Sequence, residues 1–387
     1  MRVVPDFENS IVNLMASLHG CCGWQSGVYK PLSVLDADRL SSSDNIVLLV
    51  VDGLGKRWLE SYASGGLLHS HLKHTMYSVF PSTTSAALTS FATGLAPKQH
   101  AVTGWFMYLQ ETACVAAILP FKPRIGGSTF SEMGITMEDV LGLSSVYPHL
   151  NRKCFVVNQE GIVESEFSRL VNSGATRLPY KRLDDCFNQM TDIVRAQEEK
   201  QFVYAYWPEF DGLCHLYGVE SKKVSTHFEH IEAAIERFVE SIKGTNTSLI
   251  VTADHGLIDT GADRVIHLHD HPVLEDCLQM PFSGEPRAAY AYVHGKKFKQ
   301  FEDYVSSELS EYMDCFSSES LLDEGYFGLG ELNKKLLQRI GDYVLLPKSN
   351  YVVKDKIAGE GEFSQIGVHG GLSPEEMEIP LVILNVN

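Results

Sequence analysis

Short runs of apolar residues alternate along the chain with longer segments in which apolar residues recur every three or four positions. The short runs predict buried strands, and the longer segments predict amphipathic helices that pack against them. The clearest run spans residues 46–51; the others span residues 155–157, 202–206, 248–252, 288–293 and 380–386. Because strands separated by helices are typical of parallel sheets, we expect an α/β fold with a mainly parallel sheet and helices on both of its faces.

One amphipathic helix is especially clear between the strands predicted at residues 202–206 and 248–252. Its apolar positions follow three- and four-residue spacing: Val224, Phe228, Ile231, Ile235, Phe238 and Ile242. Such spacing gives a helix one apolar stripe, and the following Gly244 is a residue that commonly ends a helix. The pattern therefore predicts a long helix that buries one side against the sheet.

The pattern changes between residues 260 and 360. This region contains a His-rich turn, Tyr-rich strand candidates, a charged segment at residues 297–311 that predicts a helix, and an apolar stretch at residues 343–353 that predicts a hairpin. We therefore predict a catalytic core made of residues 1–259 and 361–387, and a smaller inserted α+β lobe made of residues 260–360. The insertion precedes the last strand.

The chain has 387 residues, with 32 Lys and Arg against 49 Asp and Glu, which gives a formal net charge of −17. Proteins that bind nucleic acid or membrane surfaces non-specifically need a basic face, so we expect neither partner. An anionic substrate is still compatible with this charge, because bound divalent metal ions reverse the local field. No window approaches the roughly 20 apolar residues of a membrane span.

The eight cysteines show no Cys-x-x-Cys spacing, and several of them lie inside apolar runs. This distribution indicates reduced thiols that pack in the interior. Residues 1–20 hold Arg2, Asp6 and Glu8 and only a short apolar stretch, a composition that argues against a cleaved signal peptide. We therefore expect a cytoplasmic protein.

Polar residues that directly follow the predicted strands are the first candidates for chemistry, because open α/β sheets bind ligands beyond the carboxyl ends of their strands. The candidates after strands are Asp52, Asp211, His215, Asp254 and His255, and His369 precedes the last predicted strand. Taken singly, several of them have ordinary explanations, such as a turn or a carboxylate at a helix start. Together they form an oxygen and nitrogen ligand set suited to zinc or another first-row divalent ion.

A run of hydroxyl residues, from Ser82 to Ser85, precedes a short predicted helix at residues 86–94 that Gly94 closes. A hydroxyl at a helix N-terminus lies at the positive end of the helix dipole, which favours both an alkoxide and a bound phosphoryl oxygen. The run is also compatible with an ordinary Ser/Thr helix cap. The hydroxyls alone do not separate these two interpretations.

The order of the motifs resembles that of the type I phosphodiesterase/nucleotide pyrophosphatase family of the alkaline phosphatase superfamily. The matching pieces are Val-Val-Asp-Gly at 50–53, Phe-Pro-Ser-Thr-Thr at 80–84, Thr-Gly-Leu-Ala-Pro-x-x-His at 93–100, Asp-x-x-x-His at 211–215, Ala-Asp-His-Gly at 253–256 and His-Gly at 369–370. The resemblance covers residues 45–259 and 366–385. It implies an alkaline phosphatase-like core and hydrolysis of phosphodiester or phosphoanhydride bonds.

The resemblance also implies two divalent metal ions, zinc or else manganese, and a small phosphorylated substrate such as a nucleotide. Asp52, Thr84, Asp254 and His255 would surround one ion, and Asp211, His215 and His369 would hold the other. Thr84 falls on the position of the family's nucleophile, which forms a covalent phospho-threonine intermediate. Ser82, Thr83 and Ser85 are the alternatives if the local register differs.

The chain departs from the family pattern at residues 100–106, where the family often has an Asn that contacts the phosphoryl group. This chain has Trp105 near that position. Trp105, Phe106 and Tyr108 are candidates for stacking on a flat substrate group, with packing in the interior as the alternative. We assign substrate binding to Trp105.

Other activities and sites compete with this assignment. A phosphomonoesterase or a phosphonate hydrolase would use the same metals, and an Arg that grips a terminal phosphate would favour it; Arg124 is the nearest candidate. A non-catalytic binding protein on this fold is a further alternative. The His-rich segment 267–271 predicts a surface turn, with an additional metal contact as the alternative. A Cys-x-Pro-x-Arg segment, which the sulfatase branch requires, is absent from the sequence.

Overall fold

The structure is a computed structural model that describes residues 2–25, 27–196, 199–361 and 364–387. Its main sheet has seven strands in the order β2-β18-β9-β1-β8-β6-β7. Their bounds are β1 Asn45–Val51, β2 Leu72–Tyr77, β6 Lys153–Gln159, β7 Thr176–Tyr180, β8 Gln201–Trp207, β9 Thr247–Thr252 and β18 Glu378–Val386. Strands β9, β1, β8, β6 and β7 pair in parallel, and β18 runs antiparallel to β9 and β2. The predicted mainly parallel sheet is confirmed.

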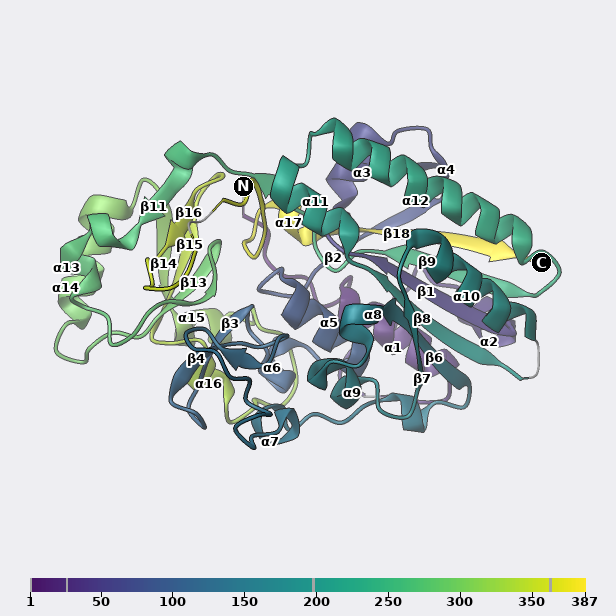
Figure 1. The fold of residues 1–387 in the computed structure, drawn as a ribbon, viewed down its shortest axis with the longest axis horizontal. Helices are drawn as coiled ribbons and strands as arrows, with labels where there is room; N and C mark the ends of the chain where they lie inside the picture. Colours follow the sequence, from purple (N-terminus) through teal and green to yellow (C-terminus); the bar gives the residue numbers. More distant parts are fainter. Residues whose placement is uncertain (1, 26, 197–198, 362–363) are drawn as a thin grey trace.

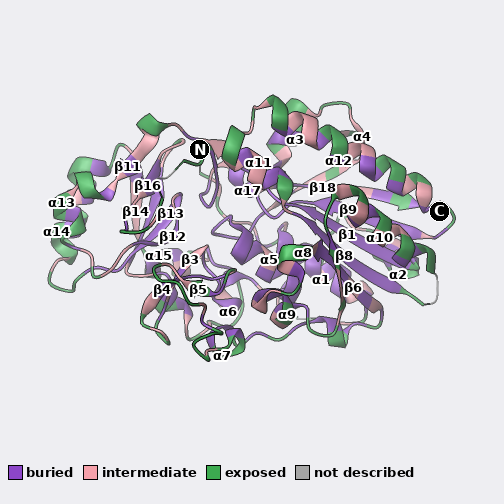
Figure 2. Cartoon of the chain, in the orientation of Figure 1, coloured by how far each residue is buried: buried purple, intermediate pink, exposed green. Residues whose placement is uncertain are grey.

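Helices cover both faces of this sheet, as predicted (Figure 1). Figure 1 shows α12 and α3 on one face, and α1 and α5 on the other. The helices of this part of the chain are α1 Ile11–Cys21, α2 Ala37–Ser42, α3 Lys56–Tyr62, α4 Leu67–Ser70, α5 Thr84–Thr93, α6 Pro97–His100, α7 Met137–Leu141, α8 Glu160–Val163, α9 Glu166–Val171, α10 Leu183–Ala196, α11 Glu209–Tyr217, α12 Lys222–Ser241 and α17 Pro374–Met377. All residues of β1, β8 and β9 are buried. Coverage on both faces explains why these strands are continuous apolar runs (Figure 2).

Two helices that the sequence predicted are present with nearly the expected bounds. Helix α12 buries the apolar positions of its stripe, from Val224 to Phe238, and Gly244 follows it with a φ of +84°. Helix α5 ends at Gly94, whose φ of +68° lies in the left-handed region that a residue with a Cβ atom rarely adopts. Helix α5 begins at Thr84, two residues earlier than predicted.

A second seven-stranded sheet forms the smaller lobe, in the order β14-β15-β13-β12-β3-β4-β5. Its strands are β3 Phe106–Leu109, β4 Cys114–Ala117, β5 Lys122–Pro123, β12 Ser283–Glu285, β13 Ala288–Ala291, β14 Met313–Ser317 and β15 Tyr343–Pro347. The lobe also holds α13 Pro272–Glu275, α14 Phe298–Tyr304, α15 Ser318–Asp323 and α16 Leu336–Arg339. Residues 106–123 thus complete a sheet whose other strands lie within residues 283–347. The boundaries of the inserted lobe at residues 260 and 360 stay a prediction.

The predicted hairpin at residues 343–353 is wrong. Strand β15 pairs with β13 and β14, whereas β16 (Val352–Lys354) pairs in parallel with β11 (Val265–His267) in a separate two-stranded sheet. The chain turns between β15 and β16 at Ser349, whose φ is +47°. An apolar run interrupted by a turn therefore supplies strands to two sheets.

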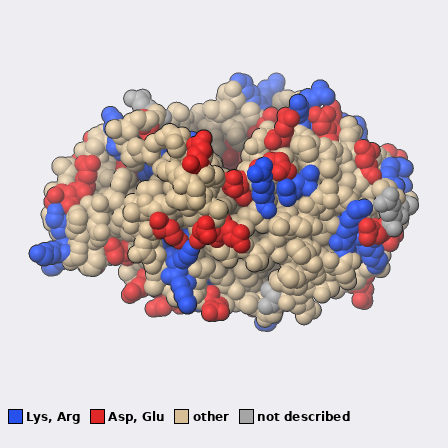
Figure 3. Space-filling view, turned by 60° about the horizontal axis from the view of Figure 1, so that its bottom comes forward, with Lys and Arg blue, Asp and Glu red and all other residues tan. Residues whose placement is uncertain are grey.

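The surface carries charges of both signs. On the face drawn in Figure 3, Lys and Arg side chains lie in small groups beside Asp and Glu. All eight cysteines are free thiols, and five of them are buried. Among the described residues, no helix combines the length and the apolar composition that crossing a membrane requires. The cytoplasmic location stays a prediction.

A buried ion pair joins the smaller lobe to the last strand of the main sheet. Arg287, between β12 and β13, donates from Nε and Nη2 to the two carboxylate oxygens of Glu376 in α17, at 3.1 and 2.8 Å. Arg287 Nη1 also donates to the carbonyl oxygens of Tyr351 and Pro347. Glu376 accepts a further hydrogen bond from the backbone N–H of Gly371 at 2.8 Å. The pair therefore fixes the lobe to the segment that leads into β18.

Removal of Arg287 should destabilise the fold strongly, because Glu376 would keep a buried charge without its partner. We expect Arg287→Ala to lower the free energy of unfolding by roughly 3–5 kcal/mol in urea unfolding followed by circular dichroism. The exposed Arg57, which pairs with Glu378, is the control, and Arg57→Ala should cost about 1 kcal/mol or less. Equal effects of the two substitutions would contradict this assignment.

Candidate active site at the strand ends

Three neighbouring parallel strands deliver most of the predicted site residues to one edge of the main sheet. Asp52 directly follows β1, Asp254 and His255 follow β9, and Asp211 and His215 lie one turn apart on α11, which follows β8. His369 lies between β17 (Gly367–Val368) and β18, and Thr84 is the first residue of α5. The structure thus brings together all seven predicted residues, which come from distant parts of the sequence.

Three of these side chains converge on the Nε2 atom of His255. This atom lies 3.2 Å from Thr84 Oγ1, 3.4 Å from Asp52 Oδ1 and 3.4 Å from Asp254 Oδ2. The other ring nitrogen, Nδ1, lies 3.2 Å from the carbonyl oxygen of Gly256. Because a carbonyl only accepts, Nδ1 carries the hydrogen, and Nε2 directs its lone pair at the carboxylate oxygens.

The remaining residues form a second group around Asp211. Its Oδ2 lies 3.1 Å from His215 Nε2, and its Oδ1 lies 3.9 Å from His369 Nε2. In both histidines Nδ1 faces a backbone carbonyl, that of Gly367 at 2.7 Å and that of Ser82 at 3.1 Å. These contacts orient each Nε2 toward Asp211, the arrangement by which proteins aim histidine ligands at a metal.

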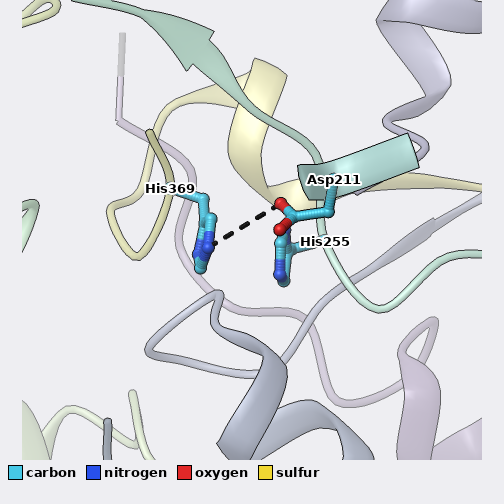
Figure 4. Close-up of side chains that lie close together, drawn as sticks. All are labelled: Asp211, His255 and His369. Carbon is cyan, nitrogen blue, oxygen red and sulfur yellow. Dashed lines mark ion pairs between the residues drawn. The ribbon is translucent and has the colours of Figure 1, made fainter. Parts of the chain in front are cut away.

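The two groups meet at His255, whose ring stacks on that of His369 with centroids 3.8 Å apart and planes at 19°. Figure 4 shows Asp211, His255 and His369 facing one another. One ligand atom from each of these three residues lies within 4.8 Å of the others, and the same holds for Asp52, Asp254 and His255. In the described part of the chain, these are the sets of three such groups close enough to share an ion.

Three buried carboxylate oxygens at this site have no hydrogen-bond partner among the described residues: Asp52 Oδ1, Asp211 Oδ1 and Asp254 Oδ2. Buried polar atoms are normally paired, because an unpaired one carries the full cost of desolvation. The oxygens face imidazole nitrogens that also offer lone pairs. Oxygen and nitrogen donors in this arrangement fit divalent cations, with zinc among the best suited.

The pKa values show that two of the three carboxylates, Asp52 and Asp254, are unfavourable to ionise without a cation. Burial, with the charges of Asp254 and Asp211, raises the pKa of Asp52 well above its usual range, and burial raises that of Asp254 to about 6. Burial also raises the pKa of Asp211, but the charge of His215 and its hydrogen bond lower it by more, so the pKa of Asp211 lies below its usual range. Burial lowers the pKa of His255 to about 4. This histidine is therefore neutral near pH 7, as a metal ligand must be.

Two residues that contact this site were not found from the sequence. The Tyr206 hydroxyl donates to Asp52 Oδ2, the oxygen that does not face His255. Glu285, at the end of β12, accepts from Thr83 Oγ1 at 2.5 Å and from the backbone N–H of Trp105 at 2.6 Å. Tyr206 lies within a predicted strand, and its polar hydroxyl in this otherwise apolar run was the signal that could have identified it. Glu285 had no such signal, because β12 is short and has no apolar run.

A cavity of about 770 Å³ opens beside Thr84, and Asp52, Asp211, His215 and His369 form part of its wall. Trp105 and Phe106 also line this cavity, so Trp105 lies where it was expected to contact substrate. Its role in binding stays a prediction. Tyr108 instead packs edge-on against Tyr292 at 5.2 Å, which makes it a packing residue.

Arg124 and the His-rich segment at residues 267–271 both make contacts with residues outside the strand-end cluster. Arg124 donates to both carboxylate oxygens of Asp355 and of Glu360, and only 3% of its side chain is exposed. It is therefore committed to these carboxylates. Residues 267–271 lie at the end of β11 in the smaller lobe (Figure 1), where His271 Nδ1 contacts the Tyr304 hydroxyl at 2.9 Å.

Comparisons with known proteins identify relatives of this chain. Ectonucleotide pyrophosphatase/phosphodiesterase family member 3 of Mus musculus is 22% identical over 240 residues, which cover 58% of this chain and 26% of that protein. The Rattus norvegicus protein of the same name matches with the same identity and coverage. The chain thus spans about a quarter of the length of these curated relatives.

Solved structures share the fold. Murine ectonucleotide pyrophosphatase/phosphodiesterase 5 superposes with a TM-score of 0.64 at 15% identity, covering 87% of each chain. Phosphonoacetate hydrolase from Sinorhizobium meliloti 1021, in complex with phosphonoformate, superposes with a TM-score of 0.60 at 18% identity, covering 88% of this chain and 90% of that one. A family model described as type I phosphodiesterase / nucleotide pyrophosphatase matches residues 46–119 and 132–372. The strand-end motifs, the fold and this match together place the chain in the type I phosphodiesterase / nucleotide pyrophosphatase family.

Proposed function

We propose that this chain is a metal-dependent hydrolase that cleaves phosphodiester or phosphoanhydride bonds in small phosphorylated molecules, with Thr84 as nucleophile. The observation that carries the proposal is the contact of Thr84 Oγ1 with His255 Nε2, which itself lies among unpaired buried carboxylate oxygens at the wall of a cavity. An inactive threonine-to-alanine variant of murine ectonucleotide pyrophosphatase/phosphodiesterase 5 has been solved in complex with AMP. A small phosphorylated ligand and a functional threonine in that protein support the same roles here.

Two divalent ions fit the residues of the site. Asp52, Thr84, Asp254 and His255 would hold one, and Asp211, His215 and His369 would hold the other. Bound there, such ions lower the pKa of a hydroxyl and neutralise charge on phosphoryl and leaving oxygens. Zinc suits the mixed carboxylate and imidazole donors best, and manganese is the alternative.

The residues of the chain then have the following roles in the reaction. Thr84 Oγ1 gives its proton to solvent, attacks phosphorus and forms a phosphoester, while the bond from phosphorus to the leaving oxygen breaks and that oxygen keeps the electron pair and takes a proton from solvent. Water then cleaves the phospho-threonine ester, which restores the Thr84 hydroxyl and releases the phosphorylated product. Thr84 sits in the first turn of α5, whose N–H groups lack partners within the helix and favour negative charge nearby.

The charges around the cavity support a diester over a monoester. A terminal phosphate of a monoester carries up to two negative charges and is commonly gripped by Arg. Arg124, the nearest candidate in the sequence, is held by Asp355 and Glu360. A diester carries one charge, which the bound metal ions would offset.

Thr84→Ala should abolish turnover because it removes the attacking oxygen. With zinc or manganese added, we expect the purified protein to hydrolyse bis-p-nitrophenyl phosphate faster than p-nitrophenyl phosphate, and the variant to lose roughly 10³-fold or more in kcat. Thr112→Ala, in the turn between β3 and β4, is the matched control and should keep full activity. Undiminished turnover by Thr84→Ala would exclude Thr84 as nucleophile, and a monoester preference would exclude the diester assignment.

Asp254→Asn should stabilise the metal-free protein at neutral pH. The folded-state pKa of Asp254 is about 6, and an Asp in the unfolded chain titrates near 4. Between these values the folded chain keeps a proton that the unfolded chain has released, so this residue makes stability fall as pH rises, by roughly 2–3 kcal/mol. The variant keeps the Oδ1 atom that accepts from Gly53 and His255 N–H but has no charge to bury.

The measurement is thermal unfolding in EDTA at pH 4.5 and 7.5, followed by addition of zinc at pH 7.5. We expect the variant to lose less stability than the wild type between the two pH values, and zinc to raise the Tm of the wild type more than that of the variant, which keeps the second group of ligands. Asp303→Asn, at an exposed carboxylate on α14, is the control. Parallel pH profiles of wild type and Asp254→Asn, or equal stabilisation of both by zinc, would contradict the metal site.

A further inference from the structure

The cavity beside Thr84 extends along one face of helix α5. Thr84, Leu88 and Ala92 all line it, and these residues are four positions apart. Residues with this spacing lie on the same side of a helix, and eight residues of helix span about 12 Å. The cavity therefore forms a channel of about that depth, which starts at the proposed nucleophile and ends near the C-terminus of α5.

Apolar side chains form the opposite wall of this channel. Phe167 and Val171 lie one turn apart on α9, and Leu119 and Ile162 complete the wall. Ala92, Phe167 and Val171 belong to one hydrophobic cluster, against which Leu88 and Leu119 pack. Leu88, Leu119 and Ile162 remain partly exposed, so apolar surface at the channel is left for a ligand to cover.

Several polar side chains along the channel already have local partners. Asn172 Nδ2 donates to Ser168 Oγ at 3.1 Å, and the Ser165 hydroxyl caps α9 by accepting from the Ser168 N–H. Asn158 Oδ1 accepts from the Gln159 N–H at 2.8 Å. These bonds reduce the hydrogen-bonding capacity that the wall offers to the edge of a base.

The charges of the wall disfavour a polyphosphate. Among the described residues that line the cavity, Lys354 is the one Lys or Arg, whereas Glu166 and Glu285, which are not among the proposed metal ligands, are acidic. A triphosphate needs several cationic partners. The channel away from the strand ends thus favours a ligand part that is neutral and apolar.

We propose that the substrate is a phosphodiester that bears an extended apolar chain, which lies in the channel between α5 and α9 while its phosphoryl group sits at Thr84. This inference rests on the proposed function and specifies its substrate class. An extended alkyl chain with carbon–carbon bonds near 1.5 Å fills a 12 Å channel with about eight to ten carbons. Burial of each methylene against these walls favours binding, up to the end of the channel.

The test compares methyl, butyl, octyl and dodecyl esters of p-nitrophenyl phosphate, together with thymidine 5′-p-nitrophenyl phosphate. We expect kcat/KM to rise by about two- to fourfold per methylene and to level off near eight to ten carbons. The octyl ester should also exceed the thymidine ester. Turnover of the methyl ester reports the proposed phosphodiesterase activity alone, so its absence would refute that function rather than the chain preference.

Two substitutions that narrow the channel from opposite walls locate the effect. Ala92→Phe on α5 and Val171→Phe on α9 should each bring the ratio of octyl to methyl kcat/KM down toward one. Two variants are used because one of them could fail to fold. Arg169→Ala, on the outer side of α9 where Arg169 pairs with Glu164, is the matched control and should keep the wild-type ratio.

Three outcomes would overturn the inference. They are a kcat/KM that does not depend on chain length, a preference for the thymidine ester, and an octyl-to-methyl ratio that both folded Phe variants leave unchanged. The second outcome would assign the channel to a nucleoside. Each outcome is distinct from loss of methyl ester turnover.

Discussion

The structure depends on the burial of three carboxylates at the ends of three neighbouring strands. Asp52, Asp211 and Asp254 follow β1, β8 and β9, respectively. One carboxylate oxygen of each lies buried without a hydrogen-bond partner in the described chain. Buried like charges repel one another and lose their hydration. Parallel pairing of the strands makes this convergence unavoidable. A cation at this edge is the natural compensation.

The surrounding chain is arranged to present these ligands. Carbonyls of Ser82, Gly256 and Gly367 hold the histidine rings through Nδ1, so that each Nε2 points inward. The smaller lobe supports the same site from the other side. Glu285 holds both the hydroxyl of Thr83 and the backbone of Trp105, while Arg287, two residues later, is anchored to Glu376. The second sheet therefore helps to position Thr84, the proposed nucleophile, and the cavity wall.

The sequence was sufficient to predict five of the seven strands of the main sheet, β1, β6, β8, β9 and β18, and the strand-end residues, because buried strands are continuous apolar runs that end abruptly in polar groups. It was insufficient where tertiary pairing decides the structure. Strands β3, β4 and β7 are short or mixed in polarity, and residues 343–353 serve two sheets rather than one hairpin. Glu285 approaches Thr83 only because β12 pairs with β3, a contact between residues far apart in the sequence. The apolar channel likewise needs α5 and α9 side by side.

We propose that the strand-end cluster holds two divalent ions beside Thr84. The most direct test is an anomalous difference map from a crystal grown with zinc, recorded above the zinc absorption edge. We expect two peaks within about 2.0–2.2 Å of ligand atoms. The first would contact Asp52, Asp254 and His255, and the second Asp211, His215 and His369. The absence of both peaks, or zinc bound only at residues 267–271, would contradict it.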